Sequence, residues 1–119
     1  MENHSCSVTV AGLEAYLHRQ YAGWASEQGL FMKLVEEMGE VAEVLNRRAG
    51  RKSNDQALLS QELGKELADV MHYVIAIAAV NELDFNQMIL EKDKEASVKY
   101  HHDMDLETFL STCSQEVRV

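Results

Sequence analysis

The sequence predicts an all-α protein built as a four-helix bundle and completed by oligomerisation. Three observations support this fold class. No proline interrupts the 119 residues, apolar residues recur at intervals of three and four, and the polar segments between these stretches are short. Short connections between amphipathic helices favour antiparallel neighbours, and bundles of this kind form their ligand sites between facing helices.

The first two expected helices precede a polar loop. The first spans residues 10–24 and carries one apolar face, formed by Leu13, Leu17, Tyr21 and Trp24. The second follows Gly29, spans 30–48 and ends with Gly50 in a left-handed turn, while Arg47 and Arg48 suit the negative end of its dipole. Residues 51–55 are then expected to form the polar loop.

The next helices complete the bundle. The third, 56–80, is the most apolar and is expected at the centre. Asp84 followed by Gln87 forms a capping-box pattern for a fourth helix that ends near residue 100, and 105–113 can form a short C-terminal helix. We therefore expect a single domain over 1–119, with its core at 10–101 and a tail or short helix at 102–119.

Composition limits the classes of function. The net charge of −9 argues against a nucleic-acid binder, which needs a basic surface, and no apolar run is long enough to span a membrane. No charged, apolar-cored leader opens the sequence, and two cysteines are too few for a disulfide framework. We therefore expect a cytoplasmic protein. Because so short a chain covers little apolar surface alone, we expect a homodimer or a dimer of dimers.

Four carboxylates in two short sequence motifs are the main functional pattern. Glu37 and Glu40 lie three residues apart in the second helix, and Glu66 and Asp69 lie three apart in the third, so each pair can face one point. Chance acid pairs are common among 20 carboxylates. Glu37 and Glu66, however, project at the edge of apolar stripes, where a buried charge needs compensation. The pattern predicts a magnesium site.

Several basic and aromatic side chains have two possible roles each. Lys92 projects beside Phe85, Met88 and Ile89, so it either covers apolar surface or contacts phosphate. Lys33 either contacts phosphate or pairs with Glu36 or Glu37. Trp24 and Tyr21 either stack on a base or belong to the core, which their apolar face favours. His72 is expected to be a hydrogen-bonded interface residue.

Two stretches then resemble a known family. Residues 33–45 read KLVEEMGEVAEVL and contain the motif EExxE. Residues 62–74 read ELGKELADVMHYV and contain the motif ExxD. They resemble the MazG-like nucleoside triphosphate pyrophosphohydrolases, and the resemblance covers residues 13–100. It implies a MazG fold, Mg²⁺ or alternatively Mn²⁺ as cofactor, and cleavage of a (deoxy)nucleoside triphosphate into a monophosphate and pyrophosphate during nucleotide-pool house-cleaning.

The resemblance also implies residue roles. Glu37 or Glu40 would activate the attacking water, and the metal ligands would be Glu37, Glu40, Glu66 and Asp69. The phosphate or substrate ligands would be Lys33, Lys92, Lys99 and Tyr100. The base would contact Trp24 and, as a weaker candidate, His18. Ala96 departs from the family pattern, since asparagine is common at this position, and this puts part of the sugar or phosphate contact in doubt.

Two other functions remain open from the sequence. A phosphoribosyl-ATP pyrophosphatase shares the acid-rich helices and the same bond chemistry. A non-catalytic acidic helical module that binds a partner would also explain solvated acid pairs.

Overall fold

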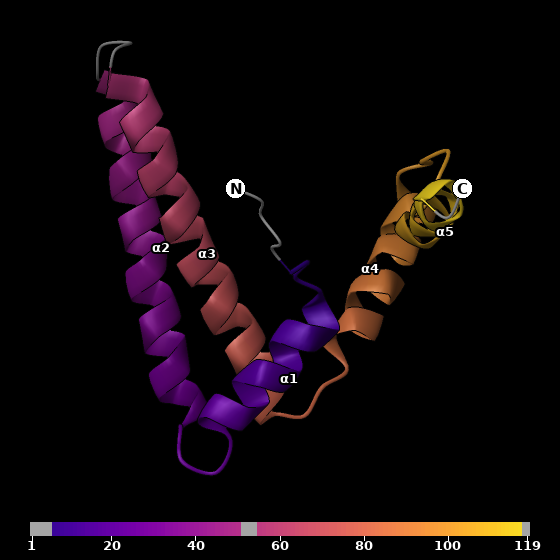
Figure 1. The fold of residues 1–119 in the computed structure, drawn as a ribbon, viewed down its shortest axis with the longest axis horizontal. Helices are drawn as coiled ribbons and strands as arrows, with labels where there is room; N and C mark the ends of the chain where they lie inside the picture. Colours follow the sequence, from indigo (N-terminus) through magenta and orange to yellow (C-terminus); the bar gives the residue numbers. More distant parts are fainter. Residues whose placement is uncertain (1–5, 51–54, 118–119) are drawn as a thin grey trace. The chain divides into compact units, whose positions relative to one another are not determined.

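The computed structural model describes residues 6–50 and 55–117. Over these residues the chain is helical with no strand, which confirms the all-α fold class. The helices are α1 (Val10–Tyr21), α2 (Glu27–Gly50), α3 (Gln56–Val80), α4 (Phe85–Lys99) and α5 (Leu106–Val117) (Figure 1). The four expected helices and the short C-terminal helix are thus all present, and the bounds of α3 are as predicted. The loop expected at 51–55 lies outside the described residues except for Asp55.

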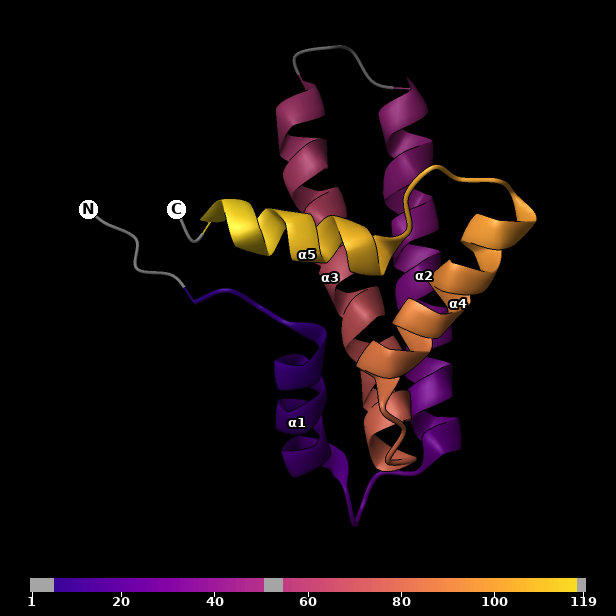
Figure 2. The ribbon, with the colours of Figure 1, turned by 90° about the vertical axis from the view of Figure 1, so that its right-hand side faces the viewer.

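The chain divides into two compact units, Met1–Leu83 and Asp84–Val119. In the first unit, α2 and α3 lie side by side as an antiparallel hairpin (Figures 1 and 2). Leu30 and Val44 of α2 and Leu59 of α3 are buried along it. Because these positions recur with the helical period, one stripe of each helix is removed from water and the hairpin forms a continuous apolar seam.

Helix α1 packs on α3 and ends earlier than predicted. Thr9 caps its start, with the side-chain oxygen accepting from the backbone N–H of Gly12 at 3.0 Å, and Leu17 is fully buried. The helix stops at Tyr21 because Gly23 has a φ of 92°, a left-handed conformation that glycine adopts without strain. Trp24 therefore lies after the helix, and the expected span of 10–24 is wrong at its end.

Helix α2 begins three residues before the predicted start. The Ser26 hydroxyl accepts a hydrogen bond from the backbone N–H of Gly29 at 3.0 Å, so Ser26 acts as the N-terminal cap and Gly29 lies within the first turn. At the other end, Gly50 is the last helical residue and does not have the expected left-handed φ. Arg47 there donates to Glu62 of α3 at 2.8 Å, which links the two helices.

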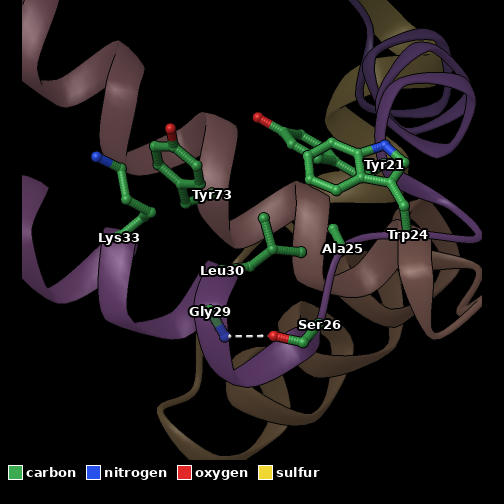
Figure 3. Close-up of a pocket in the computed structure, with 8 residues that line it drawn as sticks. All are labelled: Tyr21, Trp24, Ala25, Ser26, Gly29, Leu30, Lys33 and Tyr73. Carbon is green, nitrogen blue, oxygen red and sulfur yellow. Dashed lines mark hydrogen bonds between the residues drawn. The ribbon is translucent and has the colours of Figure 1, made fainter.

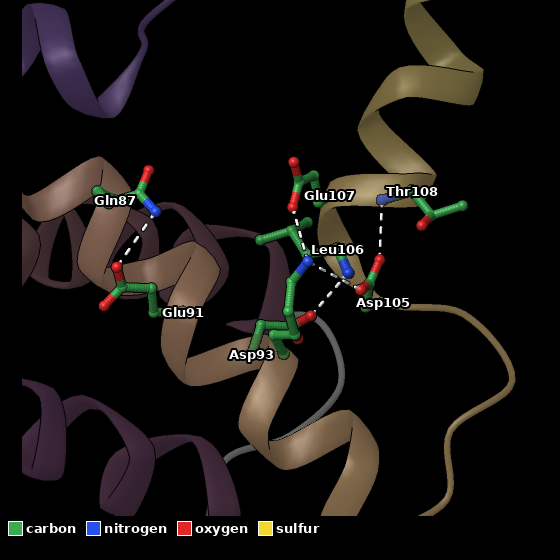
Figure 4. Close-up of polar contacts among 8 residues, drawn as sticks. Gln87, Glu91, Asp93, Asp105, Leu106, Glu107 and Thr108 are labelled. Carbon is green, nitrogen blue, oxygen red and sulfur yellow. Dashed lines mark hydrogen bonds and ion pairs between the residues drawn. The ribbon is translucent and has the colours of Figure 1, made fainter.

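The second unit contains α4 and α5, joined by polar contacts (Figure 4). Asp84 caps α4 by accepting from the Gln87 backbone N–H at 3.1 Å, as predicted, whereas the Gln87 side chain donates to Glu91 instead of completing the capping box. Asp93 accepts from the backbone N–H of Leu106 at 2.6 Å and so fixes the first turn of α5. Neither helix, nor any other among the described residues, has the length and apolar content needed to cross a bilayer.

Truncating Leu17 tests how much of the first unit depends on the contact between α1 and α3. We expect Leu17→Ala to lower the free energy of unfolding by about 3 kcal/mol, because it leaves a cavity at a fully buried position. Urea unfolding followed by circular dichroism measures the loss. The matched control, Leu58→Ala at an exposed leucine, should change stability by less than about 0.5 kcal/mol. Equal effects of the two substitutions would contradict the proposed core.

Candidate metal centre

Three of the four predicted carboxylates come together across the α2–α3 seam. Glu37 of α2 and Glu66 of α3 are half-buried, and Asp69 of α3 is exposed. Each offers one carboxylate oxygen, and these oxygens all lie within 4.8 Å of one another. We call these three residues the acidic cluster. The helical period explains it, since the seam places Glu37 opposite Glu66, and Asp69 follows Glu66 by about one turn.

Glu40 lies beside this cluster and not within it. It is exposed on α2, one turn beyond Glu37, and its charge raises the pKa of Glu66. Glu36 and Glu43 are exposed as well, which agrees with their expected solvation. The two acidic motifs therefore contribute unequally to the cluster. Helix α3 supplies two of its members, and α2 supplies one member and a nearby charge.

The electrostatics of the cluster favour a cation. Partial burial raises the pKa of Glu66, and the charges of Glu40, Glu37 and Asp69, followed by a hydrogen bond to Glu37, raise it further. Within residues 6–50 and 55–117, no ion pair involves any of these four acids. Uncompensated carboxylates provide only oxygen ligands, which are the ligands that Mg²⁺ and Mn²⁺ prefer. The residues present therefore fit the predicted metal.

Lys33 does not neutralise the cluster. Its ammonium lies 3.1 Å from a carboxylate oxygen of Glu36, and this hydrogen bond is the main reason that the pKa of Lys33 is raised. Of the two pairings considered from the sequence, the one with Glu36 is therefore observed. The contact is solvated, and surface pairs of this kind contribute little to stability.

A cavity of about 500 Å³ lies in the first unit, at the start of α2 (Figure 3). Its lining consists of Tyr21, Trp24, Ala25, Ser26, Gly29, Leu30, Lys33 and Tyr73. Trp24 is 72% exposed, so its expected place in the core is wrong, because the residue follows α1 and the helical projection no longer applies. Its ring lies 5.7 Å from that of Tyr21 at an angle of 43°. The cavity thus has an aromatic wall.

His72 connects the aromatic wall to α3. Its Nε2 lies 2.8 Å from the hydroxyl oxygen of Tyr21, and its ring meets that of Tyr21 edge-on. This confirms the expectation of a hydrogen-bonded interface histidine. Tyr21 is half-buried, and burial together with the neighbouring Tyr73 raises its pKa, so its hydroxyl stays protonated at neutral pH. Tyr21 therefore contacts His72 of α3 through both its hydroxyl and its ring.

One predicted base contact lies outside the cavity lining, and two lining residues were not predicted. His18 is absent from the cavity lining and lies 3.5 Å from a carboxylate oxygen of Glu82. Tyr73 and Ser26 do line the cavity, but sequence reasoning missed them. The position of Tyr73 could have been found, because it follows Asp69 by four residues and so shares its helical face.

The remaining predicted substrate ligands belong to the second unit. Lys92 is 81% exposed and its ammonium lies 3.8 Å from a carboxylate oxygen of Glu95 on the same helix. The helical projection placed it beside apolar residues, but α4 buries none of its side chains. Lys99 lies 5.3 Å from the centre of the Tyr100 ring. Their roles as phosphate ligands stay predictions.

The fold and the cluster together define an all-α protein with a carboxylate site suited to a divalent cation. Residues 25–99 match the model of the MazG nucleotide pyrophosphohydrolase domain. This match covers more than half of the chain, which therefore belongs to the MazG family. The resemblance of its acidic motifs predicted this family.

One solved structure adds support for the fold. The crystal structure of iMazG from Vibrio DAT 722 has a TM-score of 0.61 with this chain at 24% sequence identity, and the match covers 78% of this chain and 98% of iMazG. At this identity the likeness concerns the fold alone. No curated protein matches the sequence.

The raised pKa of Glu66 predicts a pH effect on the metal-free protein. A folded-state pKa above the unfolded value favours the protonated form in the fold, so this contribution to stability is complete below the ordinary pKa of glutamate and is lost as pH rises through the raised pKa. In a chelator, the wild-type melting temperature should fall over this pH range more than that of Glu66→Gln. Glu43→Gln, at an exposed position, serves as the control and should follow the wild type. Parallel curves for all three proteins would refute this account of the cluster.

Proposed function

We propose that this protein is a Mg²⁺-dependent (deoxy)nucleoside triphosphate pyrophosphohydrolase, which cleaves its substrate between the α and β phosphates and releases a monophosphate and pyrophosphate. The observation that carries the proposal is the acidic cluster, with three carboxylates within 4.8 Å in a chain of the MazG family. Mn²⁺ is the alternative ion.

The chain's own groups have separate tasks in this reaction. Glu37, Glu66 and Asp69, with Glu40 beside them, would hold the cation and keep it at the edge of the seam. When bound, Mg²⁺ neutralises phosphate oxygens and lowers the pKa of a water ligand. Glu37 or Glu40 would accept the proton of the attacking water, and the α–β anhydride bond breaks as pyrophosphate leaves.

The cavity gives the substrate a direction along α2. Lys33 precedes Glu37 by about one turn and also lines the cavity, so its ammonium can exchange Glu36 for a phosphate oxygen. The exposed ring of Trp24, beside that of Tyr21, then offers a stacking surface for the base. In this arrangement the triphosphate would lie near the acidic cluster, and the base would lie in the cavity at the start of α2, whose lining residues are drawn in Figure 3.

The biological setting follows from the reaction. Conversion of triphosphates to monophosphates would remove unwanted nucleotides from the cytoplasmic pool, as expected of a house-cleaning enzyme. The active form is proposed to be a homodimer or a dimer of dimers, with the nucleotide as its only other partner.

Pyrophosphate release from a panel of canonical and modified nucleoside triphosphates tests the activity. We expect Mg²⁺-dependent release by the wild type and a loss of at least about 100-fold in Glu66→Gln, because even indirect supports of a metal site change activity by 10–100-fold. Calorimetry should show weaker Mg²⁺ binding by this variant. Glu43→Gln, an exposed acid on α2, should retain both properties.

The same experiment separates the alternative functions. Phosphoribosyl-ATP is included in the panel, and hydrolysis of that compound alone would identify a phosphoribosyl-ATP pyrophosphatase. No release from any substrate, with Mg²⁺ affinity unchanged in Glu66→Gln, would support a non-catalytic binding module and would overturn the proposal.

Removing the Trp24 ring tests the base subsite. We expect Trp24→Ala to raise KM by about 10-fold, since stacking on one aromatic ring contributes roughly 1–3 kcal/mol, and to leave kcat nearly unchanged. Tyr16→Ala is the matched control, because Tyr16 is an exposed aromatic residue of α1 that does not line the cavity. A fall in kcat at constant KM would argue against base stacking at Trp24.

A further inference from the structure

A row of aromatic rings connects the cavity of the first unit to α3. The rings of Trp24 and Tyr21 lie 5.7 Å apart, and the Tyr21 ring meets that of His72 edge-on, also at 5.7 Å. The His72 ring in turn lies 4.7 Å from that of Tyr73. We call these four residues the aromatic row. Trp24, Tyr21 and Tyr73 line the cavity (Figure 3), whereas His72 is absent from its lining. Any effect of His72 on a ligand in the cavity therefore has to pass through its neighbours.

The exposed Trp24 ring is held by hydrogen bonds at the end of α1. Its indole N–H donates to the backbone carbonyl of Gln20 at 2.7 Å, and its backbone N–H donates to the carbonyl of Tyr21 at 3.3 Å. The Tyr21 carbonyl also accepts from the backbone N–H of Ala25 at 3.0 Å. Because the turn after α1 is built on Tyr21, the position of Tyr21 determines where the Trp24 ring lies.

His72 fixes Tyr21 from α3. The Nε2 atom of His72 lies 2.8 Å from the Tyr21 hydroxyl oxygen, within the normal range of a hydrogen bond. Both side chains are half-buried, so this bond is stronger than one in bulk water. A tyrosine ring that is also bonded at its hydroxyl end has less freedom to rotate about its side-chain bonds. The contact with His72 therefore orders the Tyr21 ring and, through the turn, the Trp24 ring.

The helix that carries His72 also carries two members of the acidic cluster. His72 follows Asp69 by three residues, which is about one turn of α3. One helix thus sets both the place where the cation would be held and the place of the Tyr21 ring. In the proposed reaction the cation holds the phosphates, so the base can stack only if the rings lie at a matching distance from the cluster.

We propose that His72 is a positioning residue for nucleotide binding, which acts through its hydrogen bond with Tyr21 to hold the Tyr21 and Trp24 rings in the arrangement that stacks on the base. This inference rests on the proposed function because it takes a nucleoside triphosphate as the ligand, but it does not require hydrolysis. A histidine that served only to pack α1 against α3 would affect the stability of the fold and leave the affinity for nucleotides unchanged.

Binding of non-hydrolysable nucleotides tests the proposal without turnover. Trp24 is the single tryptophan of the chain, so its fluorescence reports on a base that stacks there. The probes are the α,β-methylene analogues of one purine and one pyrimidine deoxynucleoside triphosphate, each with Mg²⁺. His72→Phe keeps an aromatic ring and removes the hydrogen bond. We expect it to raise the dissociation constant of the tighter analogue about 5-fold, the effect of losing one neutral hydrogen bond. His72→Gln, whose amide can replace Nε2, should restore most of this affinity.

Three controls separate positioning from other roles. Tyr21→Phe removes the same hydrogen bond from the other side, so the double variant with His72→Phe should bind no more weakly than either single variant. A further loss in the double variant would show that the two side chains act independently and would overturn the proposal. Inorganic triphosphate, which has no base, should bind equally to all of these variants in calorimetry. Tyr16→Phe removes the hydroxyl of an exposed tyrosine outside the cavity and should bind the analogues like the wild type.

The outcomes distinguish this proposal from the proposed function. A wild type that binds the analogues but releases no pyrophosphate would contradict hydrolysis, while weaker binding by His72→Phe would still support the role of His72. If the wild type is active, His72→Phe should raise KM about 5-fold at unchanged kcat. An active His72→Phe variant with lower stability but unchanged KM would overturn the proposal alone. If His72→Phe does not fold, Tyr21→Phe supplies the same measurement. A wild type that binds neither analogue would also overturn the proposal.

Discussion

The packing of α2 against α3 is the interaction on which the rest of the structure depends. Leu30, Val44 and Leu59 are buried in the seam, and burial of large apolar side chains is the main stabilising contribution available to a domain of this size. The same seam brings Glu37 opposite Glu66. The acidic cluster therefore needs no element of its own, because Glu37 and Glu66 occupy half-buried positions along the seam and Asp69 follows Glu66 by about one turn.

Repulsion among the carboxylates of the acidic cluster opposes the folding of the hairpin. Glu66 is half-buried and faces the charges of Glu37, Glu40 and Asp69, which together raise its pKa. Like charges at the edge of a seam oppose the hairpin, and apolar burial has to exceed their repulsion. A bound cation reverses the sign of this effect, since the same carboxylates then stabilise the folded chain by mass action. The repulsion that weakens the metal-free fold would therefore favour the binding of a cation.

Periodicity in the sequence was sufficient for the features that depend on one helix at a time. The span of α3, the half-buried position of Glu66 and the N-terminal cap at Asp84 all follow from spacing and local chemistry. Features that depend on where a helix stops or what it meets were not accessible in this way. Trp24 was placed in the core only because α1 was extended past Gly23.

The hairpin keeps charge and exposed apolar surface on separate sides. On one side the cluster around Glu66 concentrates negative charge, and on the other Met38 and Met71 present an uncharged apolar surface. A charge on the apolar side would interrupt that surface, and apolar residues among the acids would remove the carboxylates that fit a cation. The two sides therefore place opposite requirements on the residues of one hairpin, and the helical period of α2 and α3 keeps these residues apart.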